Sequence, residues 1–210
     1  SIHSWLSENL VSGDKIAYDP KLHSIAQIKK LSAALDKQDI TLTKLEDNLI
    51  DSLWTDRPDP PNGDIYPHND AYAGQTSSDK RDNIAAQLAT EQADALLITQ
   101  PENTAWLLNI RGSDVPHTPF ALSFAILSDN SDIDWFVLDG QVTQANEAAV
   151  KKHVGAGLTI HPLADLENFL AGLKGQKVLL AESFTPSHYQ GILEAAAAEI
   201  VAGDELCQDA

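Results

Sequence analysis

The chain of 210 residues lacks several features that would define its setting. It has no apolar run of about 18 residues, so the sequence excludes a membrane-spanning helix. Basic residues are scarce, because 14 lysines and arginines stand against 31 aspartates and glutamates, a net charge of −17. A surface this acidic repels phosphate, which argues against nucleic acid and anionic membranes as partners. Apolar residues still make up 43% of the chain, enough for a hydrophobic core.

Cysteine is rare and methionine is absent. Cys207 is the single cysteine, so no internal disulfide can form, and its acidic neighbours predict a raised thiol pKa and a poor nucleophile. The first residues, 1–5, lack the basic and apolar regions of a signal peptide, and no initiator methionine is present. We therefore expect the sequence to be part of a longer polypeptide.

Common catalytic and metal-binding motifs are also missing. The seven histidines are dispersed, and the sequence has no H-E-x-x-H or C-x-x-C motif, so it predicts no metal site. Glycine-rich phosphate loops do not occur, and Gly-Ser-Asp at 112–114 lacks the second glycine of a serine nucleophile motif. We interpret Asp129, Asp132 and Asp134 as solvated residues of a hairpin turn. The sequence therefore predicts no catalytic residue.

An internal repeat is present. A glycine, a lysine-led apolar strand, an acidic residue and a helix start occur at Gly13 and Lys15 and again at Gly175 and Lys177, 162 residues later. We expect the two copies to slip by one residue after the strand. A long stretch of organised sequence precedes the second copy but not the first, which predicts a truncated first domain and a complete second one.

Hydrophobic periodicity predicts alternating helices and strands, an α/β fold with a mixed sheet flanked by helices. The expected helices are 22–35, 48–54, 78–91 with Ser78 as N-cap, 101–108, 144–153, 163–173 and 187–199. The expected strands are 15–18, 40–45, 95–99, 120–128, 134–138, 158–160 and 178–181. Three prolines exclude regular structure over 57–63, so we expect an interdomain linker.

Two segments carry unusual chemistry. The first, Leu53–Pro58, places a tryptophan before a charged pair and a proline. The second, Trp106–Pro119, gathers charged residues, a glycine and two prolines in a loop after an apolar helix. Functional groups concentrate in such loops, and the candidates here are Arg111, Asp114 and His117. The structural alternative is a loop held by an Arg111–Asp114 ion pair.

These segments resemble a known family. Residues 53–58 (Leu-Trp-Thr-Asp-Arg-Pro) and 109–114 (Asn-Ile-Arg-Gly-Ser-Asp) are similar to signatures of the three-domain aminopeptidases P, the Xaa-Pro aminopeptidases of the M24 metallopeptidase family. Residues 72–76 followed by Lys80, and residues 15–20, are also similar to that family. The motif residues expected to be structural are Trp54, Asp56, Arg57, Trp106 and Gly112.

The resemblance implies one partial and one complete creatinase/prolidase-like amino-terminal domain. Residues 1–55 would be the carboxy-terminal half of the first domain, 56–77 a linker, and 78–206 the complete second domain. The catalytic domain of "pita-bread" fold would be absent. In the family it holds two divalent metal ions, usually manganese, through two Asp, one His and two Glu, so we expect no cofactor in this chain.

For this chain the resemblance implies a non-catalytic role in oligomerisation and in shaping the substrate cleft. The Arg111 loop would face the cleft or the seam between domains. The implied partners are the chain's own catalytic domain, a second copy in a homodimer, and peptide substrates, and the implied location is the cytoplasm. Two alternatives remain: a stand-alone module that binds a small ligand or a protein at the Arg111 loop, and a creatinase-like dipeptidase relative.

Overall fold

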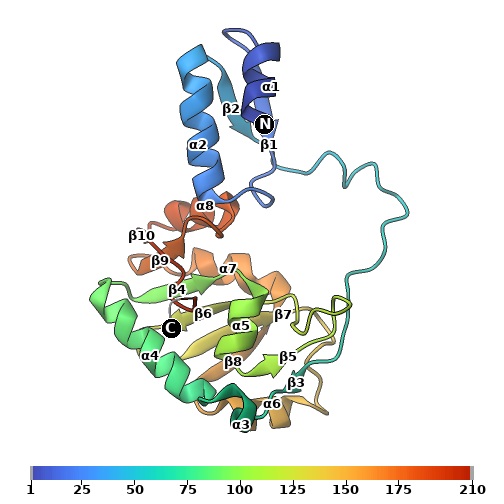
Figure 1. Ribbon diagram of the computed structural model, residues 1–210, viewed down its shortest axis with the longest axis vertical. Coiled ribbons are helices and arrows are strands. Elements are labelled where there is room, and N and C mark those ends of the chain that lie inside the picture. Colours follow the sequence, from blue (N-terminus) through green and yellow to red (C-terminus); the bar gives the residue numbers. More distant parts are fainter. Residues whose placement is uncertain (1, 209–210) are drawn as a thin grey trace.

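The computed structural model describes residues 2–208 and shows two lobes joined by a long linker (Figure 1). The smaller lobe contains α1 (Ile2–Asn9), β1 (Lys15–Tyr18), α2 (Ile25–Leu35) and β2 (Thr41–Lys44). The other helices are α3 (Asp70–Ala73), α4 (Ser77–Thr90), α5 (Pro101–Leu107), α6 (Glu147–Val154), α7 (Leu166–Ala171) and α8 (Ser187–Ala195). The other strands are β3 (Tyr66–Pro67), β4 (Ala95–Ile98), β5 (Ile110–Arg111), β6 (Phe124–Ser128), β7 (Ile133–Val137), β8 (Leu158–Pro162), β9 (Lys177–Ala181) and β10 (Glu199–Gly203).

The larger lobe is built on a six-stranded sheet of order β10-β9-β4-β6-β7-β8. Strand β6 runs antiparallel to both of its neighbours, and the other pairs are parallel. All four residues of β4 are buried, because Leu96 and Ile98 enter the core beneath α4 and α5 while Ala95 and Leu97 enter the core beneath α7 and α8. The expected α/β fold with a mixed sheet flanked by helices is confirmed.

The smaller lobe repeats the last part of the larger one. Its β1-α2-β2 unit is a parallel βαβ unit, as is β9-α8-β10. The offset of 162 residues holds from Lys15 to Ile25, the first residue of α2, so the expected one-residue slip after the strand is wrong. The difference comes after the helix start: Lys15 pairs with Thr41 but Lys177 pairs with Glu199, so the second unit is four residues shorter.

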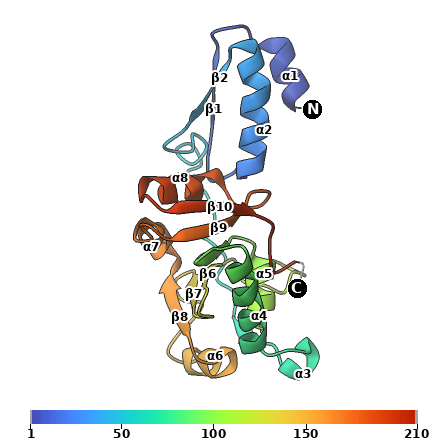
Figure 2. The same ribbon diagram turned by 90° about the vertical axis from the view of Figure 1, so that its left-hand side faces the viewer.

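The two βαβ units meet through pseudo-symmetric backbone hydrogen bonds (Figure 2). The Ile25 amide donates to the Thr185 carbonyl, and the equivalent Ser187 amide donates to the His23 carbonyl, each at 2.9 Å. A second pair repeats this relation: Ala26 N to Glu182 O, and His188 N to Pro20 O. The side chain of Ile25 also enters the core of the larger lobe. The copies therefore pack about a local two-fold axis.

Charged side chains also join the two lobes, and they give this contact a pH dependence. Glu167 on α7 accepts a hydrogen bond from Lys21 Nζ at 2.9 Å and lies 2.8 Å from His188 Nε2. These contacts, the one from Lys21 foremost, lower the pKa of Glu167 below its usual 4.5.

We expect this contribution to be complete above pH 4.5 and to be lost as the pH falls through the lowered pKa of Glu167. Glu167→Gln removes the titrating group, so the Tm difference between wild type and variant should shrink on acidification from about pH 6 to pH 3. A difference that stays constant with pH would show that the carboxylate contributes nothing to the contact. Because these side chains are largely exposed, the effect should be small.

The structure corrects several predicted boundaries. The predicted helix 48–54 is a series of turns, and α2 begins at Ile25 because Ser24 caps it, which leaves Leu22 exposed. Thr76, and not Ser78, is the N-cap of α4: its hydroxyl accepts a hydrogen bond from the Asp79 amide at 3.1 Å.

The largest error concerns the predicted helix 187–199. It ends at Ala195, and Ala197 takes a left-handed conformation with φ +59°. The chain then forms β10, a strand that the sequence analysis missed. Apolar residues continue from α8 through the turn into β10, so the sequence pattern does not show where the helical period ends and the strand period begins. Among residues 2–208 no helix is long and apolar enough to cross a membrane.

The linker is fixed at both ends and exposed between them. Residues 49–62 are all exposed and run well outside both lobes in Figure 1. At one end the Leu45 amide donates to the Tyr18 carbonyl at 2.8 Å, and at the other the Gly63 amide donates to Asp114 at 2.9 Å. From Ile65 onward the segment predicted as linker lies on the larger lobe, where β3 pairs with β5 and α3 follows.

Candidate functional site

The candidate loop 111–119 leaves the short strand β5 and closes on itself. The Gly112 amide donates to the Pro119 carbonyl at 3.2 Å. A Cβ on Gly112 would lie 2.4 Å from the Ala121 amide nitrogen, so only glycine allows this approach of the two backbones. Val115 and Thr118 form a bridge inside the loop. These contacts make the loop a rigid surface feature.

Asp114 fastens the loop to two other segments. Its Oδ1 accepts hydrogen bonds from the Gly63 amide at 2.9 Å and from Gln141 Nε2 at 2.6 Å. Its Oδ2 accepts one from the Leu122 amide at 2.7 Å. The structural alternative, an Arg111–Asp114 ion pair, is therefore wrong, because two backbone amides and the Gln141 side chain donate to the Asp114 carboxylate.

Arg111 lies beside the loop with most of its donors unused by the protein. Its Nη1 donates to the Ile110 carbonyl at 2.8 Å, and no carboxylate in residues 2–208 lies within ion-pairing distance. The guanidinium borders a hollow of about 200 Å³ whose other walls include Trp106, Pro119 and Glu102. A half-buried arginine without an acidic partner is suited to donate hydrogen bonds to a carboxylate of another molecule or domain.

His117 stands at the exposed tip of the loop. Its backbone is left-handed, with φ +63°, in a conformation that the closed loop maintains. It borders a second hollow of about 360 Å³, formed by the loop residues themselves. Pro119 lines both hollows, so the structure places Arg111 and His117 on neighbouring parts of one surface while Asp114 holds the loop from behind.

Beneath this surface, Lys80 from α4 is almost fully buried. Its Nζ lies 4.5 Å from the centroid of the Trp106 ring, and it donates to the Trp106 carbonyl at 2.9 Å and to Asn109 Oδ1 at 2.6 Å. Burial, with a further effect from the Arg111 charge, lowers the pKa of Lys80. The Trp106 ring is thus held in place by a cation–π contact with a buried lysine.

Asn109 is a hydrogen-bonding centre. It belongs to the motif at residues 109–114, but the sequence predicted no role for it. Its Nδ2 donates to Asp70 at 2.8 Å and to the Gln75 carbonyl at 2.7 Å. Its own carbonyl accepts from the His68 amide at 2.7 Å and lies 2.8 Å from His153 Nε2. A left-handed asparagine between an apolar helix and a short strand was the available signal, since Asn adopts φ +49° readily.

The segment Leu53–Pro58 is more exposed than the Arg111 loop. Trp54, Asp56 and Arg57 lie in the exposed linker, so they pack against neither lobe. Arg57 pairs with Asp51 at 2.8 Å, and its guanidinium carbon lies 5.7 Å from the centre of the Trp54 ring. This local arrangement fixes the turn but leaves the indole exposed.

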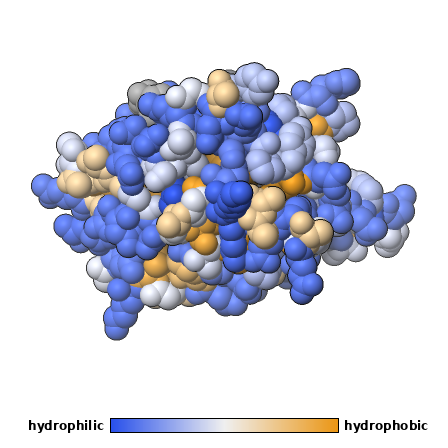
Figure 3. Space-filling model, turned by 90° about the horizontal axis from the view of Figure 1, so that it is seen from below, coloured by the Kyte–Doolittle hydropathy of each residue, from blue (hydrophilic) through white to orange (hydrophobic). Residues whose placement is uncertain are grey.

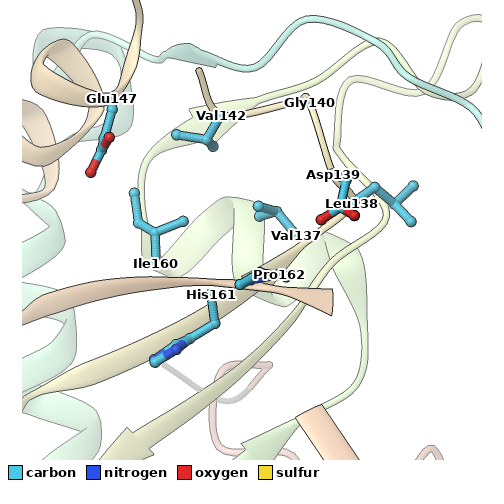
Figure 4. Close-up of a pocket in the computed structure, with 9 residues that line it drawn as sticks. All are labelled: Val137, Leu138, Asp139, Gly140, Val142, Glu147, Ile160, His161 and Pro162. Atoms are coloured by element: carbon cyan, nitrogen blue, oxygen red, sulfur yellow. The ribbon is translucent and has the colours of Figure 1, made fainter. Parts of the chain in front are cut away.

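A separate pocket of about 190 Å³ lies where β7 and β8 end (Figure 4). Asp139, Glu147 and His161 line it, but Figure 4 shows the three side chains at different sides and not converging. His161 instead lies 2.6 Å from Asp134 and stacks on Phe136. The interpretation of Asp134 as a solvated turn residue is therefore wrong, because its carboxylate is half-buried against this histidine.

No group of three or more His, Cys, Asp or Glu side chains converges to hold a metal ion within the described part of the chain. Cys207 is buried, and burial, followed by the charge of Glu205, raises its thiol pKa, in the direction that the sequence predicted. The end of the larger lobe seen in Figure 3 is mostly hydrophilic, with apolar atoms in small areas between polar side chains.

These features define a pair of α/β units built on a repeated βαβ element and carrying a rigid surface loop. The sequence profile of the Creatinase/Prolidase N-terminal domain family matches residues 56–210, and the chain belongs to this family.

Several relatives of the chain carry the name Xaa-Pro aminopeptidase. The chain is 37% identical over 133 residues to Xaa-Pro aminopeptidase 2 of Sus scrofa, covering 62% of this chain and 20% of that protein. It is 28% identical over 162 residues to a probable Xaa-Pro aminopeptidase P of Leptosphaeria maculans, covering 77% of this chain and 26% of the other. The chain thus spans about a quarter of the length of such relatives.

A solved structure has the same fold. The X-prolyl aminopeptidase of Caenorhabditis elegans, described as a cytosolic enzyme with a di-nuclear active site, matches with a TM-score of 0.85 and 24% identity. The match covers 99% of this chain but 34% of the solved chain. Both lobes therefore follow the arrangement found in that protein.

Proposed function

We propose that this chain is the amino-terminal, non-catalytic part of an Xaa-Pro aminopeptidase, an enzyme that removes the first residue of peptides with proline second. The named activity of the relatives supports the reaction, and the family supports the assignment to the amino-terminal part. The observation that carries the role of this chain is Arg111, a half-buried guanidinium without a carboxylate partner among residues 2–208, beside a closed loop.

In this proposal the surface of Arg111 and His117 faces the catalytic domain and lines one wall of the substrate cleft. A covered cleft positions short peptides and excludes folded chains, so a rigid wall contributes to catalysis without touching the reacting bond. Its partners are the catalytic domain, peptide substrates and a second copy in a homodimer. A cytoplasmic location is part of the proposal, in line with the description of the nematode enzyme as cytosolic.

The metal ions belong elsewhere in this proposal. The donors needed for a divalent metal do not converge among residues 2–208, so the residues present do not fit such a site. Two divalent ions, manganese by the family resemblance, would be held by the catalytic domain. Residues 1–210 alone, supplied with manganese, should therefore give no turnover of Xaa-Pro peptides.

Arg111→Ala in the longer enzyme tests the role of the loop. If Arg111 makes one charge-assisted contact across the cleft, kcat/KM should fall roughly ten- to a hundredfold, or about 1.5–3 kcal/mol, with little change in Tm. Lys174→Ala, which removes an exposed positive charge in the turn between α7 and β9, is the control for loss of charge.

Three results would count against the proposal. If kcat/KM stays unchanged while Tm falls, Arg111 is a structural residue. If residues 1–210 bind a ligand at the loop and the longer polypeptide has no peptidase activity, the chain is a binding module. If only dipeptides are cleaved, the parent is a dipeptidase relative.

A further inference from the structure

Asn62, at the end of the exposed linker, is the one asparagine of the sequence that glycine follows. Asparagine is a chemically labile residue, and most labile before glycine, because an amide without a neighbouring Cβ can approach the side-chain carbonyl closely. Asn62 is exposed, and no hydrogen bond holds its side chain among the described residues 2–208. The residue type, its neighbour and its exposure together favour deamidation.

The reaction begins at the backbone nitrogen of Gly63. On losing its proton, this nitrogen attacks Asn62 Cγ, the side-chain amide leaves as ammonia, and a cyclic succinimide forms. Water then opens the ring at either carbonyl and gives aspartate or isoaspartate. The net change is the consumption of water and the release of ammonia, so the reaction needs no oxidant, reductant or cofactor.

The structure restrains the nitrogen that must attack. The Gly63 amide donates to Asp114 Oδ1 at 2.9 Å, and the same oxygen accepts a hydrogen bond from Gln141 Nε2 at 2.6 Å. Loss of the amide proton would break the first bond and place a negative nitrogen beside a carboxylate, which like charges disfavour. Asp114 therefore opposes the step that starts deamidation.

The backbone of Gly63 is also packed closely against the loop. A Cβ at this position would lie 2.5 Å from the carbonyl carbon of Ser113 and 2.7 Å from the Asp114 amide nitrogen. An isoaspartate at 62 lengthens the main chain by a carbon directly before Gly63 and adds a negative charge near the Asp114 carboxylate. Because the main chain has no room to move toward the loop, this product displaces the Gly63 amide away from Asp114.

We propose that Asn62–Gly63 is a site of spontaneous deamidation that Asp114 protects, and that conversion to isoaspartate releases the linker from the loop 111–119. The hydrogen bonds between the two βαβ units do not involve Gly63, so the lobes stay in contact while the linker gains freedom. The inference rests on these contacts and not on the proposed function.

Mass spectrometry of residues 1–210 tests the protection by Asp114. Wild type and Asp114→Ala are incubated in mildly alkaline buffer, and the proteolytic peptide that contains Asn62 is followed for a mass gain of about 1 Da. We expect conversion at least ~10-fold faster in Asp114→Ala, because the amide loses a charged hydrogen-bond acceptor. Asn130, an exposed asparagine before serine that is hydrogen-bonded with Asp132, is the internal reference and should convert equally fast in both.

Two further variants separate protection from stability. Gln141→Ala removes the other donor to Asp114 Oδ1 but keeps the carboxylate and its bond to Gly63, so it should keep the wild-type rate at Asn62. Asp114→Asn keeps the size of the side chain and removes its charge, so it should also accelerate conversion, and it replaces Asp114→Ala if that variant does not fold. Equal rates at Asn62 in wild type and both Asp114 variants would overturn the proposal. Acceleration of Asn62 and Asn130 together would also overturn it, because general loosening would then be the cause.

Hydrogen exchange tests the release of the linker. The isoaspartate form of the wild-type chain is separated by chromatography, and its Gly63 amide should exchange at least ~10-fold faster than in the unmodified chain. Asn62→Gln, whose longer side chain disfavours ring closure, should keep the wild-type exchange rate after the same incubation. Unchanged protection of Gly63 in the isoaspartate form would show that the linker is not released. None of these measurements uses peptidase activity, so failure here is distinguishable from failure of the proposed function.

Discussion

Replacing Lys80 with methionine should destabilise residues 1–210 by about 2–3 kcal/mol, although methionine keeps most of the length and volume of the side chain. The substitution leaves Asn109 Oδ1 without its donor, whereas the Trp106 carbonyl loses one donor and keeps the hydrogen bond from the Asn109 amide at 3.3 Å. A buried acceptor left unsatisfied costs about 1–3 kcal/mol, and the cation–π contact with Trp106 is also lost. Relief of the buried charge offsets part of this cost.

Urea denaturation is the appropriate measurement, because the midpoint then reports stability at constant m. Lys152→Met on the exposed side of α6 is the matched control and should stay within about 0.5 kcal/mol of wild type. A wild-type midpoint for Lys80→Met would show that water replaces the lysine, and that the Asn109 contacts do not depend on it.

Asp114→Ala should destabilise the chain by about 2–4 kcal/mol, because one carboxylate accepts hydrogen bonds from Gly63, Gln141 and Leu122. Bonds to a charged acceptor are worth about 1.5–3 kcal/mol each, but Asp114 is half-buried and water can satisfy part of the set. The change should also release the linker from the loop, since the Gly63 amide is held by this carboxylate.

Hydrogen exchange separates these two effects. The amides of Gly63 and Leu122 should exchange at least ~10-fold faster in Asp114→Ala, while amides of β4 keep their protection at the level set by global stability. Asp129→Ala, an exposed aspartate in the β6–β7 turn, is the control for loss of a negative charge. Unchanged exchange at Gly63 would show that the linker does not depend on Asp114.

The sequence predicted the α/β fold well because its signals are local. The run 95–98 is apolar throughout, as a strand covered on both faces requires, and it forms β4. Pro101 fixed the start of α5 because proline fits the first helical turn. The repeat of glycine, lysine and strand at 13–18 and 175–181 corresponded to two real βαβ units.

Part of the candidate site was predicted and part was not. Arg111, Asp114 and His117 do belong to one loop, which their spacing in the sequence already implied. The partners of Asp114 lie 51, 27 and 8 residues away, at Gly63, Gln141 and Leu122. Arg111 is the basic residue nearest to Asp114 in the sequence, which suggested it as the partner. The fold instead supplies amide donors from other segments, and no sequence pattern indicates them.

The sequence by itself determined the alternation of helices and strands in the larger lobe, the net negative charge and the family resemblance, because each depends on residue type and short spacing. Only the tertiary structure decided which apolar residues are covered. Leu49 follows β2 and Leu206 follows β10, the last strands of the two βαβ units, yet Leu49 is exposed and Leu206 lies in the core with residues of α5. Burial depends on which distant segment packs against a residue, and the local pattern carries no information about that segment.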